Sequence, residues 1–160
     1  MRRRERKSAA DSVLESMGLG LMNPLRLAVL RLGWTEPAWT SPLNYGEKDG
    51  TFICAGCGST LFDSKAKFDS GSGWPSFWRT GAEGAVEYKK PDFMGRVECH
   101  CASCNGHLGH VFGDGHLCGA TKPPGDIAPA TDYVCPGGGL PRYCINGLAI
   151  RYRARADPDG

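Results

Sequence analysis

The chain has 160 residues, of which 41% are hydrophobic and 22% charged, as in an ordinary globular protein of one domain. No stretch approaches the roughly 18 apolar residues of a transmembrane helix, which excludes that class. Residues 1–7 carry five basic and one acidic side chain (+4), and the remainder carries 14 basic and 16 acidic ones (−2). A body at −2 lacks the broad basic face that nucleic-acid binding needs.

Residues 1–20 are expected to form a flexible basic leader, residues 21–155 the folded domain, and residues 156–160 a tail. Transit peptides are poor in acidic residues, whereas acidic residues such as Glu5 and Asp11 interrupt this leader. No apolar stretch suited to a secretory signal follows it. We therefore expect a cytoplasmic protein, with a mitochondrial or plastid location as the alternative.

The elements expected along the chain are one early helix followed by short strands and turns. Asn23-Pro24 predicts a helix start, because Asn caps and Pro suits the first turn, and Gly33 predicts its end. The 23 glycines and 11 prolines indicate many turns and a β-rich fold. Strand-like patterns occupy Thr51–Ile53, Val86–Tyr88, Arg96–Cys101 and Ala149–Arg153. Residues 116–141 have the composition of a loop, and a loop of this length is often functional.

Four of the eight cysteines form two C-x-x-C pairs. The residues after the pairs, Gly58 and Asn105, tolerate a left-handed backbone. Four thiolates in a tetrahedron make a closed structural zinc site that ties two distant hairpins together. The alternative is a pair of redox dithiols, which fits poorly because neither motif opens a helix in a βαβ context. The predicted ligands are Cys54, Cys57, Cys101 and Cys104.

Cys144 lies in the sequence Arg142-Tyr143-Cys144-Ile145-Asn146. If this segment is extended, Arg142, Cys144 and Asn146 share one face. A neighbouring cation lowers the pKa of a thiol, and the thiolate is the nucleophile. The pattern therefore suggests a reactive cysteine, and the alternative is an inert cysteine buried in a strand.

Two further stretches carry residues suited to chemistry. His107 and His110, with Asp114 four residues further on, are typical of proton transfer near neutral pH; zinc ligation or ordinary loop histidines are the alternatives. Trp74 lies among glycines before a proline, which suggests a rigid aromatic wall. Core packing is the alternative for its neighbours Phe68, Phe77 and Trp78.

Three motifs in this order resemble the B-type methionine sulfoxide reductases, oxidoreductases that reduce the R epimer of methionine sulfoxide, with a disulfide as acceptor, in the repair of oxidised proteins. The motifs are CxxCGxxLFxSxxKFDSGxGWPSF from Cys54, CxxCxxHLGHVFxDG from Cys101, and RYCIN from Arg142. The resemblance implies a mostly β fold. It has two antiparallel sheets in a tent-like or barrel-like arrangement, with short N-terminal helices and a zinc clamp.

The resemblance also implies roles for individual residues. Structural zinc would be held by the four cysteines of the C-x-x-C pairs, and Cys144 would attack the sulfoxide sulfur and become a sulfenic acid. Trp74 would receive the substrate methyl group. The polar pocket would contain His107, His110, Asp114, Arg142 and Asn146, with His110 supplying a proton. The implied partners are oxidised proteins that carry methionine-R-sulfoxide, and thioredoxin or another thiol reductant. We expect a monomer without a nucleic-acid or membrane partner.

The sequence departs from the family pattern at two places. Many members have a cysteine at the position of Ser72 that closes a disulfide with the catalytic thiol. The chain also carries an insert at about residues 116–139, which contains Cys118 and Cys135. Cys118 is the first candidate for the resolving thiol and Cys135 the second; an external thiol, or a Cys118–Cys135 pair that staples the insert, are the alternatives. Cys99 is expected to be a packing residue.

Other functions fit parts of the pattern. A non-catalytic, zinc-stabilised binding module could use the same scaffold, because function resides in sites rather than in folds. A zinc-ribbon nucleic-acid binder conflicts with the charge of the body, and a general thiol peroxidase is a chemical neighbour. The joint presence of Cys144, Arg142, Asn146, His110 and Trp74 favours the reductase.

Overall fold

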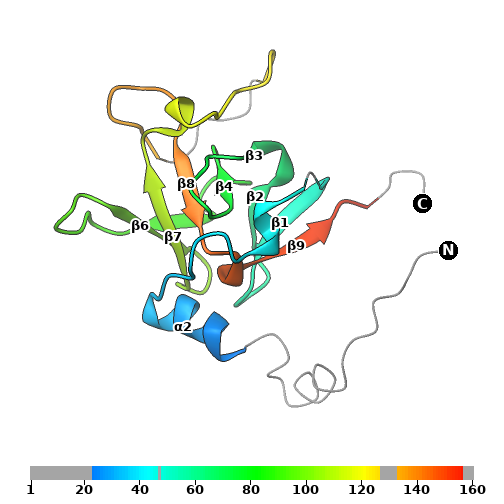
Figure 1. Cartoon of the computed structure of the whole chain (residues 1–160), viewed down its shortest axis with the longest axis vertical. Helices are drawn as coiled ribbons and strands as arrows, with labels where there is room; N and C mark the ends of the chain where they lie inside the picture. The colour runs from blue at the N-terminus through cyan, green and yellow to red at the C-terminus, as the bar shows by residue number, and fades with distance from the viewer. Residues whose placement is uncertain (1–22, 47, 127–132, 157–160) are drawn as a thin grey trace.

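Two antiparallel β-sheets form the body of the protein in the computed structural model, which describes residues 23–46, 48–126 and 133–156 (Figure 1). The predicted mostly β fold is confirmed, and the two sheets do not close into a barrel. The expected leader lies outside the described residues, as do residues 157–160 of the expected tail. Within the described ranges, no helix is long and apolar enough to cross a membrane.

The smaller sheet has three strands in the order β2-β1-β9, and the larger has six in the order β3-β4-β8-β7-β6-β5. Strand β9 directly follows the turn after β8 but pairs with β1, so the end of the chain joins the two sheets. The small sheet contains β1 (Gly50–Cys54), β2 (Thr60–Asp63) and β9 (Ile150–Ala154). The large sheet contains β3 (Lys67–Phe68), β4 (Ser76–Phe77), β5 (Val86–Tyr88), β6 (Val97–Cys101), β7 (His107–Phe112) and β8 (Arg142–Ile145).

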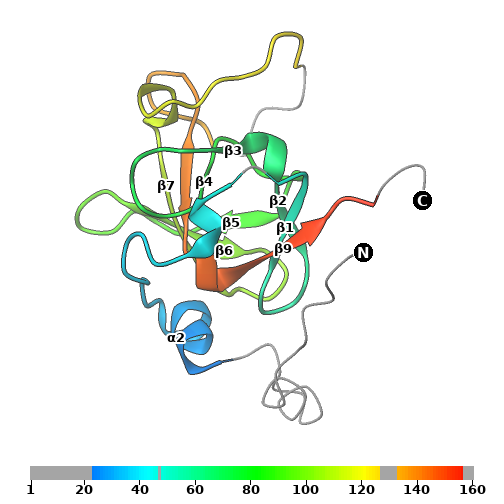
Figure 2. The ribbon, with the colours of Figure 1, turned by 45° about the vertical axis from the view of Figure 1, so that its right-hand side comes forward.

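The predicted early helix is α2, Pro24–Leu32, and both of its ends match the prediction. The Asn23 side chain accepts a hydrogen bond of 2.8 Å from the backbone of Arg26, and Gly33 ends the helix at a φ of 70°. Among the described residues α2 is the one α-helix, and short 3₁₀ turns lie at Pro42–Asn44 (η1), Ser64–Ala66 (η2), Gly115–Leu117 (η3) and Gly147–Ala149 (η4). Helix α2 and the segment that follows η3 lie at opposite ends of the molecule (Figures 1 and 2).

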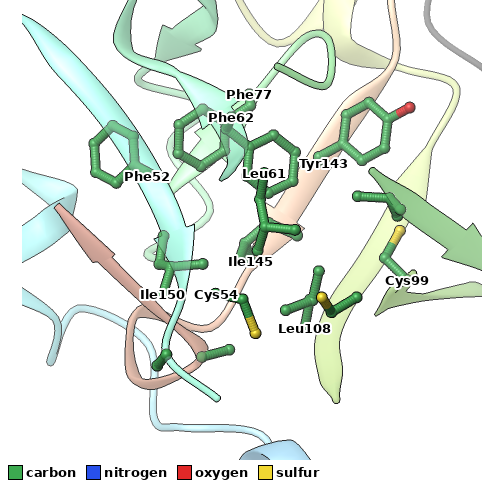
Figure 3. Packing of buried hydrophobic residues seen from close by; sticks show 14 of the residues in the cluster. Phe52, Cys54, Leu61, Phe62, Phe77, Cys99, Leu108, Tyr143, Ile145 and Ile150 are labelled. Atoms are coloured by element: carbon green, nitrogen blue, oxygen red, sulfur yellow. The ribbon is translucent and has the colours of Figure 1, made fainter. Parts of the chain in front are cut away.

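The hydrophobic core fills the space between the sheets (Figure 3). Phe77 of β4 stacks on Phe62 of β2 with ring centroids 4.4 Å apart, and Phe52 of β1 meets Phe77 edge-on at 5.0 Å. Core packing, the alternative for Phe77 and Trp78, is confirmed, since both side chains are buried. Cys99 is also buried in this core, as predicted. Aromatic contacts of this kind fix the larger sheet against the smaller one.

Candidate active site and metal centre

The four cysteines of the C-x-x-C pairs come together in a cluster that can hold a metal ion. Cys54 Sγ lies 3.7 Å from Cys104 Sγ, and Cys57 Sγ lies 3.6 Å from Cys101 Sγ. Tetrahedral ligands at the usual Zn–S distance would be about 3.8 Å apart, so the donor set and its spacing fit zinc. One pair lies on the β1–β2 hairpin of the small sheet and the other on the β6–β7 hairpin of the large one. A metal here would therefore clamp the two sheets together.

The turns of both hairpins direct their cysteine sulfur atoms toward one another. Gly58 and Asn105 take the predicted positive φ values of 79° and 60°, and the Gly56 amide donates to Cys54 Sγ at 3.3 Å. Helix α2 covers this end of the molecule, with Leu30 packed against the turns and Arg31 donating to the Cys104 carbonyl at 3.1 Å. Cys54 and Cys101 are buried, Cys104 is partly buried and Cys57 is exposed, so the cluster lies near the surface with four protein ligands.

Strand β8 presents Cys144 on the face of the large sheet that points away from the core. Tyr143 and Ile145 are 0% exposed and point into the core, so Arg142 and Cys144 alternate to the other face. The extended segment predicted from the sequence is confirmed. Cys144 pairs with Ser76 of β4 on one side and with His110 of β7 on the other. Both neighbours therefore flank the thiol on the same face.

The Cys144 thiol is partly buried and has a hydroxyl and a guanidinium beside it. Its Sγ lies 3.7 Å from Ser72 Oγ, which belongs to a hydroxyl network with Ser70 and Ser76. Burial raises the pKa of Cys144, and the Ser72 hydroxyl and the Arg142 guanidinium act in the opposite direction. The cation therefore acts as the sequence suggested, but burial outweighs it and the resting group is the thiol.

Arg142 is held in place from two sides. Its guanidinium donates to both Asp114 carboxylate oxygens, at 2.9 and 3.1 Å, and lies 4.3 Å from the centroid of the Phe112 ring. The hydrogen bond from Arg142 lowers the pKa of Asp114, which keeps this carboxylate charged. Asp114 is thus the partner of Arg142, whereas the sequence analysis placed it beside His110.

The carboxylate that faces the histidines is Glu98, which the sequence analysis missed. Glu98 of β6 pairs with His110, and its Oε2 lies 3.4 Å from His107 Nδ1. An irregularity in the β6–β7 register brings the His107 and His110 rings to 5.8 Å although they are three residues apart. Burial lowers the pKa of both imidazoles, so they are neutral near pH 7. The C-x-x-C motif between β6 and β7 indicates a turn, and the hairpin that this turn forms places Glu98 opposite His110.

Trp74 and Asn146 are linked through Glu36. The Trp74 indole N–H donates to the Glu36 carbonyl at 2.9 Å, and Asn146 Oδ1 accepts from the Glu36 amide at 3.0 Å. Asn146 is buried beyond the end of β8 and also donates to the Leu108 carbonyl at 3.0 Å. Its amide is therefore engaged with backbone groups that position the loop around the Trp74 ring.

The insert brings Cys118 to the ion pair and buries Cys135. The Cys118 thiol lies beside the Asp114 carboxylate, where it helps to lower the pKa of that group, and it is partly exposed. Cys135 is 7% exposed, and burial raises its pKa. Asp126 forms an ion pair of 3.0 Å with Arg79, which fixes the first half of the insert against the sheet. Residues 127–132 of the insert lie outside the described residues.

The sequence is similar to those of known proteins over most of its length. The SelR domain family model matches residues 22–122 and ends within the insert. A peptide methionine sulfoxide reductase MsrB of Bradyrhizobium diazoefficiens is 40% identical over 132 residues, or 81% of each chain. One from Pseudomonas entomophila is 38% identical over 91% of this chain and 96% of its own, and the reductase B5 of Oryza sativa subsp. japonica is 40% identical over 82% and 83%. The chain therefore belongs to the SelR family, the B-type methionine sulfoxide reductases.

Proposed function

We propose that the protein reduces methionine-R-sulfoxide in oxidised proteins to methionine, with Cys144 as the nucleophile. The observation that carries the proposal is the position of the Cys144 thiol, beside His110 on the next strand and Arg142 on its own strand. Membership of the family supports methionine sulfoxide as the substrate. A binding module would have no need to surround one thiol with a cation, a hydroxyl and a neutral imidazole.

The reaction oxidises Cys144 and reduces the substrate by two electrons. A bond forms between Cys144 Sγ and the sulfoxide sulfur while the thiol proton passes to the sulfoxide oxygen. The oxygen then transfers to Cys144: a bond forms between Sγ and the oxygen while the Sγ–S bond and the methionine S–O bond break, so that methionine leaves and Cys144 keeps the oxygen and its proton as a sulfenic acid. Neutral His110 carries the proton. Its lowered pKa keeps the ring neutral, so one ring nitrogen has a lone pair that can accept the thiol proton and pass it to the sulfoxide oxygen.

Arg142 stabilises the charge that develops on sulfur and oxygen during this step. The two hydrogen bonds to Asp114 and the contact with the Phe112 ring fix the guanidinium before substrate arrives. Such preorganised charge is worth more in a partly buried site than in water. His107 orients the substrate from the buried side of the pocket.

Selection of the R epimer would follow from unlike sides of the pocket. Trp74 offers an apolar wall for the methyl group, and Asn146 positions that wall through Glu36. The donors Arg142 and Ser72 are suited to the sulfoxide oxygen, and the S epimer would exchange methyl and oxygen. The partly exposed thiol is compatible with a methionine sulfoxide side chain that protrudes from a protein surface.

Cys118 is our choice for the resolving thiol. Its thiol contacts Asp114, which binds Arg142, whereas Cys135 is buried. The Cys118 thiol would attack the Cys144 sulfenic acid, form a disulfide and release water. Thioredoxin or another dithiol would then reduce the disulfide with two electrons. Ser72 cannot take this role although its hydroxyl lies 3.7 Å from Cys144 Sγ.

We further propose that the four-cysteine cluster holds a structural zinc ion. With four protein ligands no position is left for a reacting water, so this metal would stabilise the fold and take no part in the reaction. A monomer in the cytoplasm completes the proposal, and the alternative is a mitochondrial or plastid location reached through the basic leader.

The experiment that tests the reaction is turnover of separated R and S epimers of peptide-bound methionine sulfoxide with dithiothreitol. We expect the wild type to convert the R epimer alone, and Cys144→Ser to lose more than about a thousandfold in kcat/KM, as removal of a nucleophile does. Cys118→Ser is the matched cysteine control and should keep the full rate with this reductant. Turnover of the S epimer, or activity retained in Cys144→Ser, would refute the proposal.

A further inference from the structure

A second cluster of metal-binding side chains lies in the large sheet, apart from the four cysteines. It contains Glu98 and His100 of β6 and His107 of β7, whose ligand atoms all lie within 4.8 Å of one another. Glu98 Oε2 is 3.0 Å from His100 Nε2 and 3.4 Å from His107 Nδ1. Ligands at tetrahedral positions around zinc with Zn–N and Zn–O distances near 2.1 Å would be about 3.4 Å apart. The spacing therefore suits a bound transition-metal ion.

The hydrogen bonds of His100 fix the ring as metal ligands usually have it. Its Nδ1 lies 3.0 Å from the Asn105 carbonyl oxygen. A carbonyl can only accept, so Nδ1 carries a hydrogen, and Nε2 faces the Glu98 carboxylate. The contact of 3.0 Å between Nε2 and the carboxylate is satisfied by either a proton or a metal ion. Histidine ligands of metals usually donate their other ring N–H to a backbone carbonyl in this way.

His107 provides the second, independent observation. The residue is 2% exposed, and within the described part of the chain neither ring nitrogen makes a hydrogen bond of good geometry, Nδ1 having only the 3.4 Å contact with Glu98. A buried polar atom without a partner is costly, and native proteins rarely leave one. A proton on His100 would satisfy its contact with Glu98 but would leave His107 Nδ1 with only the long contact of 3.4 Å. A metal ion bound to Glu98, His100 and His107 would give His107 Nδ1 a close partner as well.

We infer that Glu98, His100 and His107 form a second binding site, for a divalent transition-metal ion. Two imidazoles and one carboxylate are a donor set that zinc takes, with a remaining position open to solvent or substrate. The site is half-open, because the Glu98 side chain is 41% exposed and that of His100 15%. An ion could therefore enter and leave this site.

Occupancy of this site would affect the pocket, a consequence that rests on the proposed function. His107 would be bound to the ion through Nδ1 and lost to the substrate, and the cation would lie near His110, which pairs with Glu98 across the strands. We therefore expect a bound ion to inhibit the reductase reversibly.

The test is calorimetric titration of the full chain, already holding one zinc ion per molecule, with Zn²⁺ alone. We expect one further equivalent to bind to the wild type, and His100→Gln to weaken this binding more than about a hundredfold, since loss of an outer contact alone costs 10–100-fold. Glu98→Gln should weaken it likewise. His116→Gln, which removes an exposed histidine in η3, is the matched control and should bind as the wild type does.

Imidazole NMR spectra provide a readout independent of activity. On addition of Zn²⁺ the signals of His100 and His107 should shift and that of His116 should not. Equal affinity in the wild type and His100→Gln, or loss of binding in Cys144→Ser, would overturn the inference, because the ion would then be held elsewhere. An inactive protein that still binds the second ion would count against the proposed function and leave this site standing.

Discussion

Two regions of the molecule use cysteine sulfur for opposite purposes. At the α2 end, four sulfurs face one another at 3.6–3.7 Å under a covering helix. On the outer face of β8, one sulfur lies beside a serine hydroxyl and an arginine. A tetrahedral set of thiolates leaves a metal ion no free coordination position. A single thiol next to a neutral imidazole is suited to accept oxygen from a sulfoxide. Surroundings, and not residue type, separate a structural cysteine from a reactive one.

Removal of a metal ligand should produce the largest effect. We expect Cys101→Ser to lose the bound metal and to lower Tm by more than about 10 °C, because structural zinc contributes several kcal/mol and each kcal/mol shifts Tm by about 2–4 °C. Metal content by mass spectrometry and thermal unfolding check this. Cys118→Ser, outside the cluster, should change neither; a Cys101→Ser protein that keeps its metal and its Tm would contradict the clamp.

Loss of the proposed proton carrier, His110, should have the next largest effect. His110→Gln should lower kcat with dithiothreitol about a hundredfold, the usual effect of losing a general acid–base. The neutral ring is required, and burial lowers its pKa below the ordinary 6.5, so the rate should persist as pH falls through 6.5 and decline only below it. A pH profile of kcat/KM measures this, with His116→Gln as control. An acidic limb centred above pH 7 would exclude His110 in this role.

The resolving thiol should show an effect that depends on the reductant. Cys118→Ser should lose about tenfold or more with thioredoxin, which needs a disulfide, and little with dithiothreitol. Cys135→Ser should behave as the wild type with both. The Ser72 hydroxyl lies 3.7 Å from Cys144 Sγ, so adding Ser72→Cys to Cys118→Ser should restore the thioredoxin rate. Wild-type rates in Cys118→Ser with thioredoxin would remove Cys118 from the reaction.

The smallest expected effect concerns the protonation state of Cys144 before substrate binds, which sets its rate of alkylation. Because burial raises the pKa of Cys144 above that of an ordinary thiol, the group should be mainly thiol at pH 7, and iodoacetamide should alkylate it more slowly than a free cysteine. Arg142→Met should slow alkylation by a further factor of about three at fixed pH, since the cation favours the thiolate. Mass spectrometry that locates the label on Cys144 follows the reaction against pH in both proteins. A midpoint below pH 8 would show that the pocket activates the thiol before substrate binds.

Much of this arrangement followed from local patterns in the sequence. The spacing of the C-x-x-C pairs predicted the cluster, Asn23-Pro24 predicted the start of α2, and alternation predicted that Tyr143 and Ile145 face the core. Such features depend on residues close in the chain, whose geometry is fixed by the backbone. The roles of the pocket residues stay predictions until the experiments above are made.

Other contacts depend on which strands are neighbours, and the sequence does not state that. Glu98 faces His107 and His110 because β6 pairs with β7 at an irregular register, and Asp114 meets Arg142 because the insert returns the chain beside η3. The balance at Cys144 is likewise tertiary, since burial by β4 and β7 outweighs the cation two residues away. The sequence by itself indicated the four-cysteine cluster, the family and the extended segment that carries Cys144. Only the packing of distant strands decided which charges surround that thiol, because those charges arrive from segments far apart in the chain.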